Sequence, residues 1–425
     1  MKKILLAAFL LSCTCLTQGQ LFAVEFEVYQ SSYKPLNLVV LANAKVDDVN
    51  EKSLLRAMVE KDLDASRSFK TLDPLSHLVT EAEAFDDLSY SDWRIIGTDL
   101  LVMLGLEKME GGWRVDMQLH DPFRNRLLVK ESLTEQSARG IQHLAHRVAD
   151  FIYHHQTGLP GYFNSKIAFV KKHGYFADLM LMDADGANLQ TIGKDFTLLL
   201  SPDISPDRTQ VALNTYVGNR PRLEFFDLQT GQRTTFGGFK GLNSTPEFSP
   251  DGRYVAATLS HTGNSEIHLY DLKSKKWRQF TNNPAIDTTP TWSPDSKWIA
   301  YTSNRNGTPQ IYRQSLANNQ VIRVSLDAPY NTSPVWAPIG DRIAFVTKKE
   351  WEYAIATVHI DGTGLRYLAT GERIESPAWS PNGQMILYSA EDKGRKHIYS
   401  VPIWGGEAKM VSPVGMDASD PAWSR

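Results

Sequence analysis

Four histidines between positions 143 and 155 are the residues whose type and spacing first suggest chemistry. His143, His146, His154 and His155 could bind a transition metal, because imidazole is a common metal ligand. Apolar residues at 141, 144, 148, 151 and 152 mark the core face of a helix, which places His143, His146 and His154 on its polar side. We therefore expect solvated histidines and no metal site.

Other short patterns also fall short of a catalytic site. The sequence has no G-x-S-x-G, H-E-x-x-H or P-loop motif. Asp185-Gly186 and Asp361-Gly362 resemble pieces of calcium loops, but the other ligands are missing, so we expect turns. We expect no cofactor and no enzyme activity. The alternative is a propeller hydrolase acting on a sugar or peptide, which clustered carboxylates of raised pKa would favour.

The first residues predict secretion. Lys2 and Lys3 precede the apolar run 4–11, and a short polar stretch then leads to Leu21-Phe22-Ala23, which is the pattern of a signal peptide over 1–23 cleaved after the small residue Ala23. The apolar run is too short to span a membrane. The alternative is a lipoprotein signal that leaves an acylated Cys13. A formal net charge of −3 gives no reason to expect nucleic-acid binding.

The second half of the chain repeats. Six segments share a Pro, a short strand and a turn, as in PEFSPDG and PTWSPDS. They begin at Pro202, Pro246, Pro290, Pro334, Pro377 and Pro421, with spacings of 44, 44, 44, 43 and 44 residues. The S-P-D-G turns and the short alternating strands predict about four strands in each repeat, which is one propeller blade. We predict an all-β six-bladed propeller over 165–425.

The phase of the repeat predicts how the ring closes. The repeat that begins near Ser165 lacks its Pro-x-Trp strand, and the chain ends on Pro421-Ala-Trp423. We expect this last strand to complete that blade. Tryptophan recurs once per repeat, with Phe248 at the equivalent position, and we interpret these residues as packing between blades rather than as a ligand-stacking ring. The tryptophans are Trp292, Trp336, Trp379 and Trp423.

The region before the propeller has a different pattern. A buried strand over 36–42, a helix capped by Asn50, a hairpin at Gly111-Gly112 and a helix over about 135–155 predict an α/β domain with a mixed sheet over 36–160. Val24, Phe26 and Val28 alternate as in a strand, within an N-terminal arm over 24–35. The chain is therefore predicted to be multidomain.

Three segments resemble the TolB family of the Tol–Pal system. They are Asp92-Trp93-Arg94 with Gly97-Thr98-Asp99, Leu119-His120-Asp121 with Phe123, and the run His146-Arg147-Val148-Ala149-Asp150 with Ile152-Tyr153, Thr157-Gly158 and Gly161-Tyr162-Phe163. The resemblance covers essentially the whole chain after Ala23. It departs at Leu100, in the turn after Asp121 and in the short arm.

The resemblance implies a monomeric periplasmic adaptor that does not span the membrane. Its partners would be the lipoprotein Pal at the propeller mouth and the inner-membrane protein TolA at the N-terminal arm, in a system that serves outer-membrane integrity and cell division. The loops that lead into the innermost strands should reach one rim of the tunnel. The candidate Pal-binding residues there are Leu242, Asn243, Ser244, Thr245, Asp287, Thr288, Thr289, Asn331, Thr332, Ser333, Glu375 and Ser376.

Overall fold

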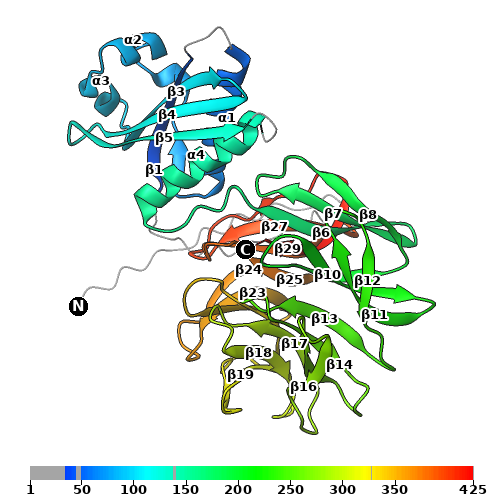
Figure 1. The fold of residues 1–425 in the computed structure, drawn as a ribbon. Coiled ribbons are helices and arrows are strands. Elements are labelled where there is room, and N and C mark those ends of the chain that lie inside the picture. The colour runs from blue at the N-terminus through cyan, green and yellow to red at the C-terminus, as the bar shows by residue number, and fades with distance from the viewer. Residues whose placement is uncertain (1–33, 45–48, 137–139, 327, 425) are drawn as a thin grey trace, which may run out of the picture.

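The computed structural model describes residues 34–44, 49–136, 140–326 and 328–424, which form an N-terminal α/β domain and a six-bladed β-propeller (Figure 1). Both parts of the predicted fold are confirmed. The predicted signal peptide and the arm residues Val24, Phe26 and Val28 lie outside the described residues.

A five-stranded mixed sheet in the order β2-β1-β3-β4-β5 forms the centre of the N-terminal domain. Strand β1 runs parallel to its neighbours β2 and β3, whereas β4 and β5 follow antiparallel. The strands are β1 (Leu36–Ala44), β2 (Phe69–Thr71), β3 (Leu100–Met109), β4 (Gly112–Asp121) and β5 (Arg126–Gln136). The turn between β3 and β4 needs Gly111, whose φ is 80°.

Helices cover both faces of this sheet, which explains why β1 and β3 are almost continuously apolar. Leu38 and Val40 pack toward the pair α1 and α4, and Val39 and Leu41 pack toward the other face with Trp93. The helices are α1 (Val49–Ala65), the 3-10 turn η1 (Pro74–Ser76), α2 (Glu81–Asp86), α3 (Tyr90–Ile95) and α4 (Gly140–Thr157).

Two predicted helix starts are wrong. Helix α1 begins at Val49, so Asn50 lies within the helix rather than capping it. Helix α4 begins at Gly140 instead of about 135, because Glu135 and Gln136 still pair with β4 as the last residues of β5. Helix α2 was not expected, although Thr80 and Glu83 form the capping box that could have indicated it.

Six four-stranded sheets form the propeller, numbered here as blades in chain order. Blade 1 contains β9 (Leu199–Ile204), β10 (Gln210–Val217), β11 (Arg220–Asp227) and β12 (Arg233–Gly237). Blade 2 contains β13 (Asn243–Phe248), β14 (Tyr254–Leu259), β15 (Glu266–Asp271) and β16 (Lys276–Gln279). Blade 3 contains β17 (Asp287–Trp292), β18 (Trp298–Ser303), β19 (Gln310–Ser315) and β20 (Val321–Arg323).

The remaining blades follow the same order. Blade 4 contains β21 (Asn331–Trp336), β22 (Arg342–Lys349), β23 (Glu352–His359) and β24 (Arg366–Gly371). Blade 5 contains β25 (Ile374–Trp379), β26 (Met385–Asp392), β27 (Arg395–Pro402) and β28 (Lys409–Met410). Blade 6 combines the C-terminal strand β29 (Asp417–Trp423) with β6 (Lys166–His173), β7 (Phe176–Asp183) and β8 (Gln190–Phe196).

The ring closes as the repeat predicted. Strand β29 pairs antiparallel with β6, with Ala422 opposite Ala168 and Trp423 opposite Ile167. The recurring tryptophans and Phe248 are buried, and Trp379 packs in a cluster that contains residues of both blade 4 and blade 5. The interpretation that these residues pack between blades is confirmed.

The two ends of the propeller differ. The N-terminal domain contacts the end where each innermost strand turns into the second strand. Pro160 O accepts from Asn382 Nδ2 (3.2 Å) in the β25–β26 turn, and Asn164 O accepts from Arg208 Nη1 (3.3 Å) in the β9–β10 turn. We call this the junction end. The opposite end, where each innermost strand begins, is called the mouth.

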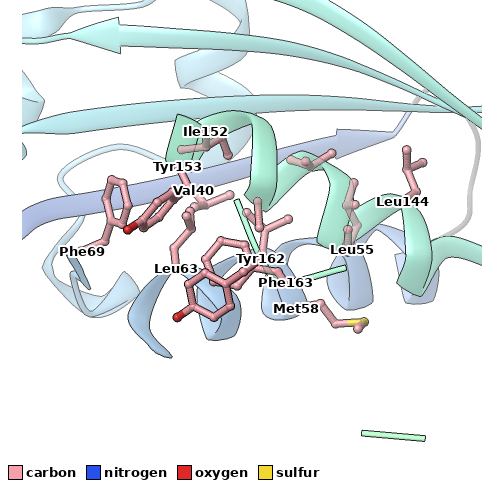
Figure 2. Close-up of a cluster of buried hydrophobic side chains, with 14 of the residues drawn as sticks. Val40, Leu55, Met58, Leu63, Phe69, Leu144, Ile152, Tyr153, Tyr162 and Phe163 are labelled. Carbon is pink, nitrogen blue, oxygen red and sulfur yellow. The ribbon is translucent and has the colours of Figure 1, made fainter. Parts of the chain in front are cut away.

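Helix α4 and the segment after it join the two domains through one hydrophobic core. Tyr153 of α4 packs edge-on against Tyr162 and Phe163, and Tyr162 packs edge-on against Trp423 of β29. Figure 2 shows Tyr162 and Phe163 beside residues of α1 and α4, such as Leu63. The ring-closing tryptophan therefore also belongs to the domain junction.

Candidate functional site: the propeller tunnel and its mouth

The repeated prolines line the propeller tunnel. Residues of all six innermost strands surround a cavity of about 180 Å³. The prolines in its wall are Pro202, Pro246, Pro290, Pro334, Pro377 and Pro421. Proline suits this position because the innermost strand has one edge facing the tunnel, where a missing N–H breaks no ladder bond.

The residue before each of these prolines has a left-handed backbone, which the sequence did not predict. The positive φ angles are 46° at Ser201, 48° at Thr245, 50° at Thr289, 53° at Ser333, 53° at Ser376 and 52° at Asp420. The pairing register shifts across these residues in all six innermost strands, which indicates a bulge. Each blade therefore places one polar residue at the same level of the tunnel.

The twelve predicted binding residues divide into two sets. Nine are partly exposed near the mouth end of β13, β17, β21 and β25: Leu242, Ser244, Thr245, Thr288, Thr289, Thr332, Ser333, Glu375 and Ser376. The other three, Asn243, Asp287 and Asn331, are buried at the first position of their strands. Their side chains hold the rim in place beneath its surface.

Asp287 shows how a buried rim residue acts. It is fully buried, and its Oδ2 accepts from Asn283 Nδ2 (2.7 Å) in the preceding loop. The same oxygen lies 3.3 Å from Arg305 Nη2 in the β18–β19 turn. One carboxylate therefore ties together the two loops that form the rim of blade 3.

Large apolar side chains are exposed on the mouth, and the sequence analysis missed them. Tyr175 in the β6–β7 turn is 93% exposed, Trp351 in the β22–β23 turn is 92% exposed, and Val414 before β29 is 87% exposed. Phe176, Val217 and Ile286 are exposed at the same end. Aromatic residues at hairpin tips, such as Tyr175 after Gly174, were the available signal. Exposed apolar groups of this kind mark interaction surfaces.

The carboxylates of the tunnel wall are engaged by the neighbouring blade. Asp203 Oδ2 accepts from Phe248 N (2.7 Å), and Glu247 Oε1 accepts from Trp292 N (3.1 Å). Burial raises the pKa of Asp420, whose carboxylate also accepts a hydrogen bond from Ser419 Oγ (2.8 Å). Asp420 Oδ1 also accepts from Ser376 Oγ of the preceding blade (3.3 Å), so each of these three carboxylates joins two neighbouring blades.

His146 is not solvated, which corrects the sequence interpretation. It is 3% exposed, and its Nδ1 lies 2.7 Å from Asp62 Oδ2 of α1. His143 pairs with Glu135 Oε2 (2.6 Å), and His154 is exposed as expected. Helical spacing placed His146 on the polar side of the helix, but Asp62, 84 residues away in sequence, packs against it there.

Two groups of histidine and aspartate in the described residues have side-chain atoms within 4.8 Å of one another. In His173, Asp178 and Asp195, the first two pair directly (3.0 Å) and the site is partly open to solvent. In His146, Asp183 and Asp185, a lysine contacts each carboxylate: Lys166 on Asp183, and Lys61 on Asp185. The protein's own cations therefore occupy the second group.

The two suspected calcium-loop fragments are turns, as expected. Asp185 Oδ1 accepts from Ala187 N (2.9 Å), and Asp361 Oδ1 accepts from Thr363 N (2.9 Å). Both are local turn bonds of aspartate. Among the helices that the structure describes, none is long and apolar enough to cross a lipid bilayer.

Comparison with known proteins agrees with this geometry. Residues 153–425 match the family described as the TolB beta propeller domain, and residues 24–128 match the TolB amino-terminal domain. The chain is 34% identical over 226 residues to the Tol-Pal system protein TolB of Paramagnetospirillum magneticum, covering 52% of this chain and 50% of that protein. It is 35% identical over 198 residues to the protein of the same name from Nitrosococcus oceani, covering 44% of each.

The chain thus spans about half the length of these curated relatives. The crystal structure of TolB from Acinetobacter baumannii aligns with 95% of this chain and 100% of its own, at 29% identity and a TM-score of 0.84. The fold, both domain matches and this alignment show that the chain belongs to the TolB family of the Tol–Pal system.

Proposed function

We propose that this chain is a periplasmic, non-enzymatic adaptor of the Tol–Pal system. Its propeller mouth binds the lipoprotein Pal, and its N-terminal arm over 24–35 binds the inner-membrane protein TolA. Through these contacts it contributes to outer-membrane integrity and cell division. The protein reaches the periplasm by a cleaved signal peptide over 1–23.

The exposed apolar side chains of the mouth are the observation that carries this proposal. Tyr175, Trp351 and Val414 are each more than 85% exposed, on the end of the propeller that the N-terminal domain leaves free. Aromatic residues provide most of the energy at protein interfaces, because they bury a large area when a partner docks. A globular protein partner such as Pal fits a surface of this kind.

The rim of the tunnel supplies the polar part of the proposed contact. Ser244, Thr288 and Thr332 lie at the second position of β13, β17 and β21 and are partly exposed. Hydroxyl groups donate and accept hydrogen bonds, so they suit the polar rim that surrounds an apolar contact. Asn243, Asp287 and Asn331 support this rim from below.

Binding of purified Pal, measured by isothermal titration calorimetry, tests the proposal. Trp351→Ala and Thr288→Ile should each weaken the affinity about tenfold or more, since the first removes an anchor and the second adds bulk on the rim. Leu75→Ala is the matched control, because Leu75 is equally exposed (92%) but lies on the N-terminal domain. Unchanged affinity in both mouth variants, with normal melting, would place the Pal site elsewhere.

A further inference from the structure

Three contacts across the domain junction pair a cationic side chain of the N-terminal domain with an acceptor of the propeller. Lys61 Nζ of α1 lies 2.8 Å from Asp185 Oδ2, in the β7–β8 turn. His146 Nε2 of α4 lies 3.8 Å from Asp183 Oδ2, at the end of β7. Arg67 Nη2 donates to the backbone oxygen of Glu407, beyond β27 (3.3 Å). In each case the N-terminal domain supplies the cation and the propeller supplies the acceptor.

His146 is the buried member of this set. Its two ring nitrogens face carboxylates from different domains: Asp62 on its own domain and Asp183 on the propeller. All three side chains are at least nine-tenths buried, with residue exposures of 3%, 1% and 5%. Only a doubly protonated imidazole can direct an N–H toward both carboxylates at once.

The charged side chains around His146 balance only if the imidazole carries a second proton. Lys61 from α1 and Lys166 from β6 contact Asp185 and Asp183. Asn188 Nδ2 also donates to Asp183 Oδ2 (2.8 Å). Asp62, Asp183 and Asp185 therefore face two lysines, and the imidazolium of His146 balances the third negative charge. Asp150, one turn further along α4, accepts from Phe163 N (2.8 Å) and holds the interdomain segment.

We propose that the protonated His146 side chain is an ionic lock between the domains, which fixes the N-terminal domain on the propeller through Asp62 and Asp183. Loss of this charge leaves Asp183 facing a neutral group and frees the N-terminal domain to move about the segment that follows α4. The lock is independent of Pal and TolA, so it stands or falls separately from the proposed function.

The direction of the pH effect follows from the environment of His146. Burial alone would lower its pKa, but the facing carboxylate of Asp183, 3.8 Å from Nε2, and the hydrogen bond with Asp62 outweigh burial and raise the pKa to about 10. Burial also raises the pKa of Asp62, and the hydrogen bond with His146 opposes that rise. Burial would raise the pKa of Asp183, but the facing imidazole of His146 and the hydrogen bonds from Lys166 and Asn188 outweigh burial and lower the pKa.

A folded-state pKa above the ordinary value of 6.5 means that the charged form is favoured by folding. The stabilisation is therefore complete below pH 6.5 and is lost as the pH rises toward 10. Burial raises the pKa of Asp150 to about 6, so that group titrates below this interval. The interval from pH 6.5 to 10 is thus the range in which the lock is expected to weaken.

The first experiment measures melting from pH 6 to pH 10.5 in the full chain carrying His146→Gln. The matched control is His143→Gln, the same substitution on the same helix, where the histidine pairs with Glu135 inside the N-terminal domain. The His146 variant should melt several degrees below the control near pH 6.5, and the difference should close by pH 10.5. A difference that stays constant over this range would overturn the proposal.

The second experiment measures domain motion directly. Spin labels on Leu75→Cys and Val414→Cys, which are exposed on the two domains, report the interdomain distance. The distribution should be narrow in the parent protein at pH 7, and broad at pH 10.5, in His146→Gln and in the isosteric Asp183→Asn. A narrow distribution in all four samples contradicts the lock. So does a rise in melting temperature on adding Zn²⁺ that His146→Gln abolishes, because a metal would then hold the site.

Discussion

A single hydroxyl on the second strand of a blade joins that blade to the next. Thr302 Oγ1 of β18 accepts from Ser333 N (3.1 Å), and Thr258 Oγ1 of β14 accepts from Thr289 N in the same way (3.1 Å). Both donors are the positive-φ residues of the tunnel wall. The threonine hydroxyl therefore fixes the backbone at the residue with the positive φ angle. At the equivalent position in blade 4 the chain has Val346, which carries no acceptor.

The hydroxyl of Thr302 and its absence at Val346 predict different effects for two substitutions of equal size. Thr302→Val should lower the free energy of unfolding by about 1 kcal/mol or more, because Ser333 N loses its acceptor inside the tunnel wall. Val346→Thr should be neutral or stabilising, since its hydroxyl would lie where Ser376 N can donate to it. Urea denaturation of both variants measures the effect, and equal losses would refute the role given to the hydroxyl.

At the scale of elements, the C-terminal strand completes the ring and anchors the segment between the domains. Ser424 N donates to Lys166 O (2.8 Å), and Trp423 Nε1 donates to Ser165 Oγ (2.7 Å). Trp379 differs, because its indole donates to Val335 O in the preceding blade (2.8 Å). The indole of Trp423 therefore bonds to the residue that leads into β6, whereas the indole of Trp379 bonds to the neighbouring blade.

Removal of residues 421–425 should destabilise the propeller far more than the loss of five terminal residues normally does. Trp423→Ala alone should cost about 3–5 kcal/mol, the usual loss for a buried tryptophan. Trp351→Ala is the control, since the same change at an exposed tryptophan removes no packing. Thermal unfolding and size-exclusion chromatography report the result. A truncated protein that melts like the full chain and stays monomeric would contradict the closure.

At the scale of the whole molecule, the two domains present separate surfaces. The mouth lies at the end of the propeller opposite the junction, and the core of the N-terminal domain begins with β1 at Leu36. Leu36 N already donates to Ser68 O (3.0 Å), so the described domain is anchored from that residue onward. Binding at the mouth and binding at the N-terminal arm are therefore expected to involve different residues.

Deletion of residues 24–33 should leave the melting temperature nearly unchanged and abolish binding to TolA. The physical reason is that the anchored core starts at Leu36, while an arm with alternating apolar residues suits strand addition to a partner. Calorimetry and a TolA pull-down measure the two effects, and Pal affinity serves as the internal control. A fall in melting temperature of many degrees would show that the arm belongs to the core.

The sequence by itself determined most of the elements and their order. The fixed repeat, the turn residues and the final Pro421-Ala-Trp423 segment led to six blades and to closure by the last strand, because these features depend on local turn chemistry and strand periodicity. The apolar runs of the first domain led in the same way to a mixed sheet with helices. The sequence prediction started helix α4 too early. Strand β5 continues to Gln136 because Gln136 pairs with Gly112 of β4, and local sequence does not reveal that pairing.

Only the tertiary structure decided which polar groups are buried and what they face. Helical spacing alone left His146 on a polar face, whereas packing of α1 and the β7–β8 turn encloses it between Asp62 and Asp183. From its place among the predicted rim residues, Asp287 was expected at the surface. In the structure it is buried, and Arg305 of the β18–β19 turn covers it. Periodicity shows which residues share one face of a helix or strand. Whether that face is buried depends on elements from distant parts of the chain that pack against it.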